Sequence, residues 1–155
     1  MINIIAVGKV NADYFREAIN EYLKRLTALT KIKIIEISES KLNSDSTKDI
    51  LKVMNEEGIA ILEKAKGVII ALDIQGSEIT SVELSNLIKN KQVEGASEIS
   101  FIIGGSNGLS EEVLRKADYR ISFGRLTYPH QLMRVILIEQ IYRAFTILSN
   151  IKYHK

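Results

Sequence analysis

The sequence contains no cysteine and only two histidines, His130 and His154, among its 155 residues. The lack of cysteine excludes disulfide frameworks, thiolate zinc sites and cysteine nucleophiles. The scarcity of histidine argues against a histidine-rich metal centre, so we expect no metal. No apolar run approaches the roughly 18 residues of a membrane helix, and the N-terminus lacks a basic start and a cleavage site. We therefore expect a cytoplasmic protein with no membrane contact.

The size and composition are those of an ordinary globular domain. Hydrophobic residues make up 46% of the chain and charged residues 26%, which argues against disorder. A chain of 155 residues can bury a substantial core without covalent cross-links. We expect a single domain over residues 1–155.

Positive charge is concentrated at the C-terminal end. The net charge is +2, yet residues 125–155 carry five cations, one anion and both histidines. A polyanionic partner is therefore expected to bind this segment, although charge alone is equally compatible with a solvated basic tail.

Strand-like and helix-like segments alternate along the chain. Strands are predicted at residues 2–7, 31–37, 68–73, 99–103 and 119–123. Helix starts are predicted at Asn11, Ser46, Thr80 and Ser110, which can act as N-caps, and Pro129 suits the first turn of a last helix that ends near Ser149. Gln75-Gly76 is predicted to be a turn after the third strand. The alternation predicts an α/β fold with a mainly parallel sheet of five or six strands and helices on both faces.

The last predicted helix is apolar on two sides. Six residues form one stripe, namely Met133, Leu137, Ile141, Ala144, Phe145 and Leu148. A second stripe contains Leu132, Val135, Ile136, Tyr142 and Ile147. One sheet cannot cover both stripes, so we expect the helix to pack against a second subunit in a homodimer.

Arg134 lies within the first stripe, where an unpaired cation would be costly. It either forms an ion pair with Glu139 or another acid, or it contacts a ligand or RNA. On the second interpretation, Arg134→Ala should reduce turnover far more than folding stability.

Three loops should meet at the carboxyl edge of the sheet, where α/β proteins bind ligands. They span residues 72–76, 104–108 and 123–130. The glycines at 104, 105 and 108 do not fit the G-x-G-x-x-G dinucleotide pattern, and the chain has no P-loop motif. The loops therefore predict a pocket with cations at its rim, but they do not identify a reaction.

Four stretches resemble the ribosomal RNA large-subunit methyltransferase H family, which belongs to the SPOUT class of knotted methyltransferases. They are IGGSNGL at 103–109, LTYPHQLMRV at 126–135, EQIYRA at 139–144 and the ending YHK at 153–155. The resemblance implies a homodimer with a C-terminal trefoil knot. It also implies that S-adenosyl-L-methionine methylates N3 of a pseudouridine in a stem-loop of 23S ribosomal RNA, in the assembled ribosome.

The resemblance also assigns residues to the site. The cofactor pocket would contain Leu72, Gly104, Phe123, Gly124, Arg125, Leu126, Thr127 and Tyr128. The catalytic candidates are His130, Arg134, Tyr153 and His154, because the imide nitrogen must lose a proton and its negative charge must be stabilised. The tail of one subunit would complete the site of the other, and Lys152 and Lys155 would contact phosphate.

Two other functions remain open from the sequence. The first is an RNA-binding ribosome assembly factor that keeps the fold without catalysis. The second is a knotted methyltransferase that acts on another RNA. Because the net charge is modest, we expect recognition of a composite ribosomal surface rather than naked RNA.

Overall fold

The computed structural model describes residues 1–154, which contain five strands in one sheet. The strands are β1 (Ile2–Val7), β2 (Ile32–Ile37), β3 (Val68–Glu78), β4 (Ile99–Ile103) and β5 (Tyr119–Ser122). Their order is β2-β1-β4-β3-β5 and every neighbouring pair is parallel. The predicted α/β fold is confirmed, with five strands. All five carboxyl ends consequently lie at one edge of the sheet.

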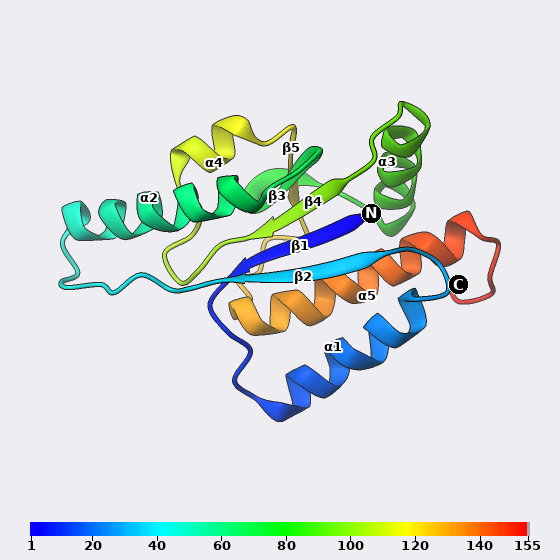
Figure 1. Cartoon of the computed structure of the whole chain (residues 1–155), viewed down its shortest axis with the longest axis horizontal. Helices are drawn as coiled ribbons and strands as arrows, with labels where there is room; N and C mark the ends of the chain where they lie inside the picture. Colours follow the sequence, from blue (N-terminus) through cyan, green and yellow to red (C-terminus); the bar gives the residue numbers. More distant parts are fainter. Residues whose placement is uncertain (155) are drawn as a thin grey trace.

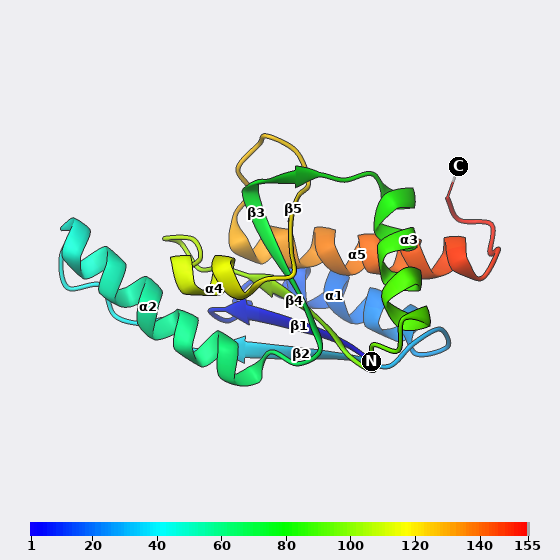
Figure 2. The same ribbon diagram turned by 90° about the horizontal axis from the view of Figure 1, so that it is seen from above.

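Helices cover both faces of this sheet (Figures 1 and 2). They are α1 (Asp13–Leu26), α2 (Thr47–Lys64), α3 (Ser81–Val93), α4 (Glu111–Lys116) and α5 (His130–Leu148). Helices α1, α3 and α5 share one core with the sheet, and α2 and α4 share the other. Alternation along β1 explains the two cores, because Ile4 faces the α5 side and Ile5 the α2 side.

Three of the four predicted side-chain caps are present. Thr80 forms a reciprocal capping box with Glu83, and the Ser46 and Ser110 hydroxyls accept backbone N–H groups of α2 and α4. The Asn11 cap is wrong, since α1 begins at Asp13 after Ala12. The Asn11 backbone N–H instead donates to the Gln131 side chain at 2.9 Å, which ties this loop to α5.

The predicted turn at Gln75-Gly76 is also wrong, because β3 continues to Glu78. Its pairing with β5 shifts register between Leu72 and Ser77. A Cβ atom at Gly76 would lie 2.6 Å from the Arg120 carbonyl carbon, so only glycine allows this approach. Because Leu72 and Ser77 both pair with Ile121, residues 73–76 have no partner on β5 and form a bulge at the carboxyl edge.

Helix α5 buries the central four residues of its first apolar stripe, leaves Met133 and Leu148 at the ends of that stripe partly buried, and leaves the second stripe half-buried. Leu137, Ile141 and Ala144 are fully buried, whereas Leu132, Val135 and Ile136 are not. The second subunit that would cover these residues stays a prediction, as does the knot. Within residues 1–154, no helix is long and apolar enough to cross a membrane.

Candidate active site

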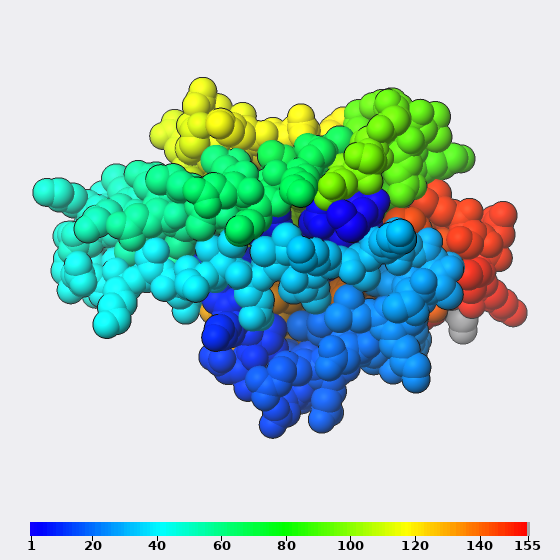
Figure 3. Space-filling model, viewed as in Figure 1, coloured from blue at the N-terminus to red at the C-terminus, as the bar shows by residue number. Residues whose placement is uncertain are grey.

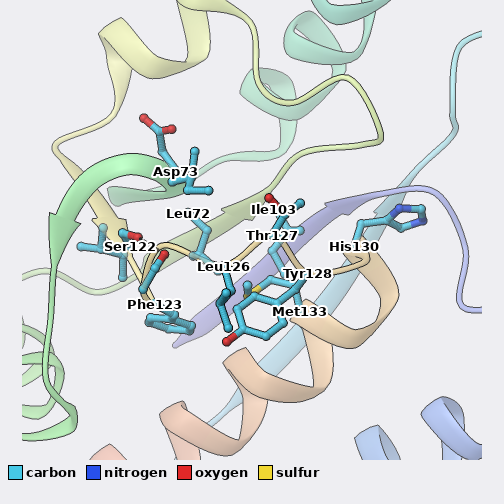
Figure 4. Close-up of a pocket in the computed structure, with 13 residues that line it drawn as sticks. Leu72, Asp73, Ile103, Ser122, Phe123, Leu126, Thr127, Tyr128, His130 and Met133 are labelled. Carbon is cyan, nitrogen blue, oxygen red and sulfur yellow. Dashed lines mark hydrogen bonds between the residues drawn. The ribbon is translucent and has the colours of Figure 1, made fainter.

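A cavity of about 210 Å³ lies at the carboxyl edge of β3, β4 and β5 (Figure 4). It is lined by Leu72, Asp73, Ile74, Ile103, Ile121, Ser122, Phe123, Gly124, Leu126, Thr127, Tyr128, His130 and Met133. We call it the edge pocket. The lining joins residues 72–74 of β3 to the loop between β5 and α5 and to the first turn of α5, so two of the three expected loops meet here and the loop at 104–108 does not line this cavity.

The interior of the edge pocket is mainly apolar. Leu72, Phe123 and Met133 come from three different elements and form its walls (Figure 4). Asp73 is the acid in the lining, and its carboxylate accepts hydrogen bonds from Arg120 Nε at 2.9 Å and Nη2 at 2.6 Å. Because this ion pair neutralises Asp73, the pocket offers a predominantly apolar slot with backbone groups at its edge.

A second hollow of about 370 Å³ adjoins the edge pocket and shares Leu72, Asp73 and Ile74 with it. Its remaining lining comes largely from the glycine-rich loop after β4. A Cβ atom at Gly104 would lie 2.8 Å from the Gly108 carbonyl carbon, so the loop can close this tightly only with glycine there. Together the two hollows can accept a ligand with a flat group and an extended arm.

Six of the predicted cofactor residues line the edge pocket, namely Leu72, Phe123, Gly124, Leu126, Thr127 and Tyr128. Gly104 lines the adjoining hollow, whereas Arg125 is exposed and lines neither. The resemblance did not assign Asp73, Ile74 or Ser122 of this lining, nor the three apolar residues Ile103, Ile121 and Met133. Among those three, the first two come from strand ends and the third from the first turn of α5, and their apolar patterns indicated only a core position.

His130 lies at the rim of the edge pocket, and its imidazole points away from Phe123 and Tyr128 (Figure 4). The ring approaches the end of β1, where a Cβ atom at Gly8 would be 3.5 Å from Nε2. The same point is 3.7 Å from Oε2 of Glu39. His130 is therefore a nitrogen base at the mouth of the pocket with a carboxylate nearby.

Arg134 does not line the edge pocket. Its side chain is 1% exposed, and the guanidinium donates to Glu36 Oε1 at 2.9 Å and to the Val7 and Gly8 carbonyls at 2.6 and 2.7 Å. Burial lowers the pKa of Arg134, which Glu36 partly opposes. The sequence offered two interpretations, and the structure favours the ion pair with an acid. The acid is Glu36, because Glu139 pairs with Arg143.

Tyr153 and His154 lie beyond the other end of α5. The Tyr153 hydroxyl donates to Glu139 Oε1 at 3.1 Å, and His154 Nδ1 lies 3.5 Å from Arg143 Nη1. Burial, followed by its hydrogen bonds, raises the pKa of Tyr153. Tyr153 bonds to Glu139, nine residues after His130 and about 14 Å along the helix axis at 1.5 Å per residue, and His154 lies beside Arg143, one turn further on. Neither side chain therefore reaches the His130 end of α5 in its own subunit. Lys155 lies outside the described residues.

No metal centre is evident in the part of the chain that the structure describes. Residues 1–154 contain no group of three or more histidine, cysteine, aspartate or glutamate side chains arranged to hold an ion.

Comparison with known proteins identifies the family. A family model described as "Predicted SPOUT methyltransferase" matches residues 1–154. The chain belongs to the SPOUT methyltransferase family. Among curated SPOUT relatives, ribosomal RNA large subunit methyltransferase H 1 of Clostridium perfringens (strain SM101, type A) is 48% identical over 157 residues, covering 99% of each chain.

Solved structures of other proteins share the fold. A probable methylase family protein from Haemophilus influenzae Rd KW20 matches with a TM-score of 0.53 at 15% identity, covering 99% of this chain and 70% of that one. A putative methyltransferase from Legionella pneumophila, solved with the bound cofactor SAM, gives a TM-score of 0.50 at 11% identity, covering 92% and 65%. At these identities the likeness concerns the fold alone.

Proposed function

We propose that this SPOUT methyltransferase transfers a methyl group from S-adenosyl-L-methionine to N3 of a pseudouridine in a stem-loop of 23S ribosomal RNA. The protein would act in the cytoplasm, as a homodimer and on the assembled ribosome. One observation carries the proposal: six of the eight residues that the family resemblance assigns to the cofactor line one pocket at the carboxyl edge. The 48% identity to a relative named for ribosomal RNA methylation supports the RNA substrate.

The residues of the two hollows fit the methyl donor. The apolar walls at Leu72 and Phe123 suit an adenine ring, and the close backbone approach at Gly104 suits the groups attached to it. Gly124, with φ +110°, allows the loop after β5 to turn over the pocket. When bound, the donor supplies a methyl group on a positively charged sulfur, so the protein must mainly align the nucleophile.

The chain must also remove a proton from the pseudouridine imide before N3 can attack. We assign this step to His130, which belongs to the lining of the edge pocket; its imidazole points towards the end of β1, so the ring must rotate about its side-chain bonds to face a base at the pocket. Tyr153 is unsuited to be the base, since burial raises its pKa and keeps the phenol protonated. Arg134 supports the site from behind by fixing the end of β1 beside His130.

A homodimer would bring the C-terminal tail to a pocket. Two α5 helices packed antiparallel about a two-fold axis place the C-terminal end of one beside the N-terminal end of the other. The half-buried second stripe of α5 offers an apolar surface for such packing. Tyr153, His154 and Lys152 of one subunit would then lie near His130 of its partner.

Two measurements test the proposal. Calorimetry should detect binding of S-adenosyl-L-methionine, and no binding would favour a non-catalytic assembly factor. Mass spectrometry of 23S ribosomal RNA from a strain that lacks the gene should show the loss of one N3-methylpseudouridine. Loss of a methyl group from another RNA would instead indicate a different substrate.

A further inference from the structure

A separate hollow of about 450 Å³ lies at the same edge of the sheet, on the β2 side of β1. It is lined by Lys9, Val10, Asn11, Arg16, Ile19, Asn20, Leu23, Ile34, Glu36 and Arg134. We call it the α1 groove, since α1 supplies one wall. Arg134 lies one helical turn after His130, so the groove and the edge pocket flank the same end of α5.

The α1 groove combines three kinds of surface. Ile19, Leu23 and Ile34 give it an apolar floor, while the amides of Asn11 and Asn20 are exposed at its sides. An apolar floor bounded by amide donors and acceptors is suited to a nucleobase, which has a flat apolar face and a polar edge.

The charges of the α1 groove favour an anion. Its lining contains three cations and one acid; Arg134 is paired with Glu36 and Arg16 with Asp13, so the charge left over in the groove is that of Lys9. Lys9 is exposed and takes part in no ion pair among residues 1–154. An ammonium group in this position can contact a phosphate without losing a protein partner.

Arg134 provides an independent indication of a ligand. Its Nε is the one buried side-chain nitrogen or oxygen without a hydrogen-bond partner in the described part of the chain. Its Nη1 donates to Glu36 and its Nη2 donates to the Val7 and Gly8 carbonyls, so both terminal nitrogens have partners and Nε has none. A buried donor without an acceptor is costly, so an occupant that brings an oxygen to this wall is favoured.

We propose that the α1 groove binds a nucleotide of the RNA substrate that flanks the methylated one. The base lies on the apolar floor and the phosphate faces Lys9, while the target base approaches the donor from outside the edge pocket, on the other side of His130. This inference rests on the proposed RNA methylation and adds a substrate subsite to it.

The test measures binding to ribosomes from a strain that lacks the gene, by co-sedimentation with S-adenosylhomocysteine present. Lys9→Ala should weaken binding about tenfold and lower the slope of log affinity against log salt by about one. Asn20→Trp fills the groove and should weaken binding about tenfold without changing that slope. Matched controls are Lys66→Ala, at the amino edge of the sheet, and Asn55→Trp, on α2, and both should bind as the wild type does.

Calorimetry with S-adenosylhomocysteine separates this inference from the proposed function. Unchanged cofactor affinity in Lys9→Ala and Asn20→Trp shows that both variants fold, so their weaker ribosome binding would support the groove. If they bind ribosomes like the controls, the subsite is refuted while the proposed function stands. A wild type that binds neither cofactor nor ribosomes refutes the proposed function instead.

The same variants also test two other possible occupants of the α1 groove, a second copy of the chain and a free nucleotide. If Asn20→Trp changes the oligomeric mass but not ribosome binding, the groove is a contact between copies and the inference is overturned. Calorimetry with uridine monophosphate tests a free nucleotide. If uridine monophosphate binds tightly and Asn20→Trp abolishes that binding while ribosome binding stays intact, the inference is also overturned.

Discussion

The ion-pair partner of Arg134 can be identified only in the folded chain. Its position in an apolar stripe indicates that it needs a partner, but the partner, Glu36, lies 98 residues away. Local spacing pointed to Glu139, which pairs with Arg143 instead. Helical periodicity identifies near neighbours on the same helix, whereas contacts between α5 and the ends of β1 and β2 depend on the fold.

Replacing Arg134 should therefore affect stability, contrary to the expectation from sequence. Arg134→Ala leaves the Val7 and Gly8 carbonyls without donors and Glu36 without its partner, so we expect a loss of about 3 kcal/mol in the free energy of unfolding. Urea denaturation of the wild type and of Arg134→Ala measures this loss. Arg115→Ala, on the surface of α4, should change stability by less than about 1 kcal/mol. Equal midpoints for the two variants would contradict the structural role.

Glu57 gives the stability a pH dependence. The side chain is 4% exposed, and burial raises its pKa above 4.5, with Glu39 and Glu56 adding to the rise and the Ser40 N–H opposing it. The folded state thus holds this proton more tightly than the unfolded state. The resulting stability is fully present below pH 4.5 and is lost as the pH rises through the folded pKa.

The substitution Glu57→Gln should remove this dependence, because the amide can still accept the Ser40 N–H without carrying a charge. From pH 4.5 towards neutrality, the wild type should lose stability relative to the variant. Urea denaturation at several pH values measures the difference, with Glu63→Gln on the exposed side of α2 as control. If the difference in unfolding free energy between the wild type and Glu57→Gln does not change with pH, the prediction is wrong.

At the scale of helices and strands, most helix N-termini and most apolar repeat patterns could be predicted from the sequence. Thr80 and Ser110 carry their signals within three residues, because a cap and the N–H groups it satisfies are close in the chain. The extension of β3 could not be predicted in this way. Gln75-Gly76 has the composition of a turn, and the strand continues past it because Leu72 and Ser77, on either side, both pair with Ile121 of β5, more than 40 residues later.

Gly76 should accordingly be sensitive to a single added methyl group. Gly76→Ala places Cβ within 2.8 Å of three Arg120 and Ile121 backbone atoms, and we expect a loss of about 2 kcal/mol and weaker S-adenosylhomocysteine binding. Thermal denaturation and calorimetry measure the two effects. Ser77→Ala, at the exposed neighbouring position, is the control and should leave both unchanged. Wild-type affinity in Gly76→Ala would mean that the β3 segment does not shape the pocket.

At the scale of the whole molecule, the sheet edge explains why distant motifs form one site. Leu72 and Tyr128 are far apart in sequence, but parallel strands deliver both to the carboxyl edge, and this meeting could be predicted from the strand pattern. The position of the residues after α5 could not be predicted from the strand pattern. The chain turns back after α5, and Tyr153 packs against Tyr142 and bonds to Glu139 in the middle of the helix; Figure 2 shows the chain terminus beside the C-terminal half of α5. Figure 3 shows α2 and the preceding loop extending beyond the body of the molecule.

This placement predicts sites shared between two subunits. Sedimentation should give about twice the chain mass of 17.4 kDa. His130→Ala and a variant lacking residues 153–155 should each be inactive alone. Random mixing of their subunits should restore about a quarter of the wild-type rate, because half the dimers gain one intact site of two. No recovery on mixing would mean that the tail does not act in the partner.

The central claim is that the edge pocket holds the methyl donor beside His130. A crystal structure of the dimer with S-adenosyl-L-methionine at saturating concentration tests it most directly. The account predicts the donor against Leu72, Gly104 and the loop from Phe123 to Tyr128, with its methyl group facing the His130 side. A donor bound elsewhere, or electron density that leaves this pocket empty, would contradict the account.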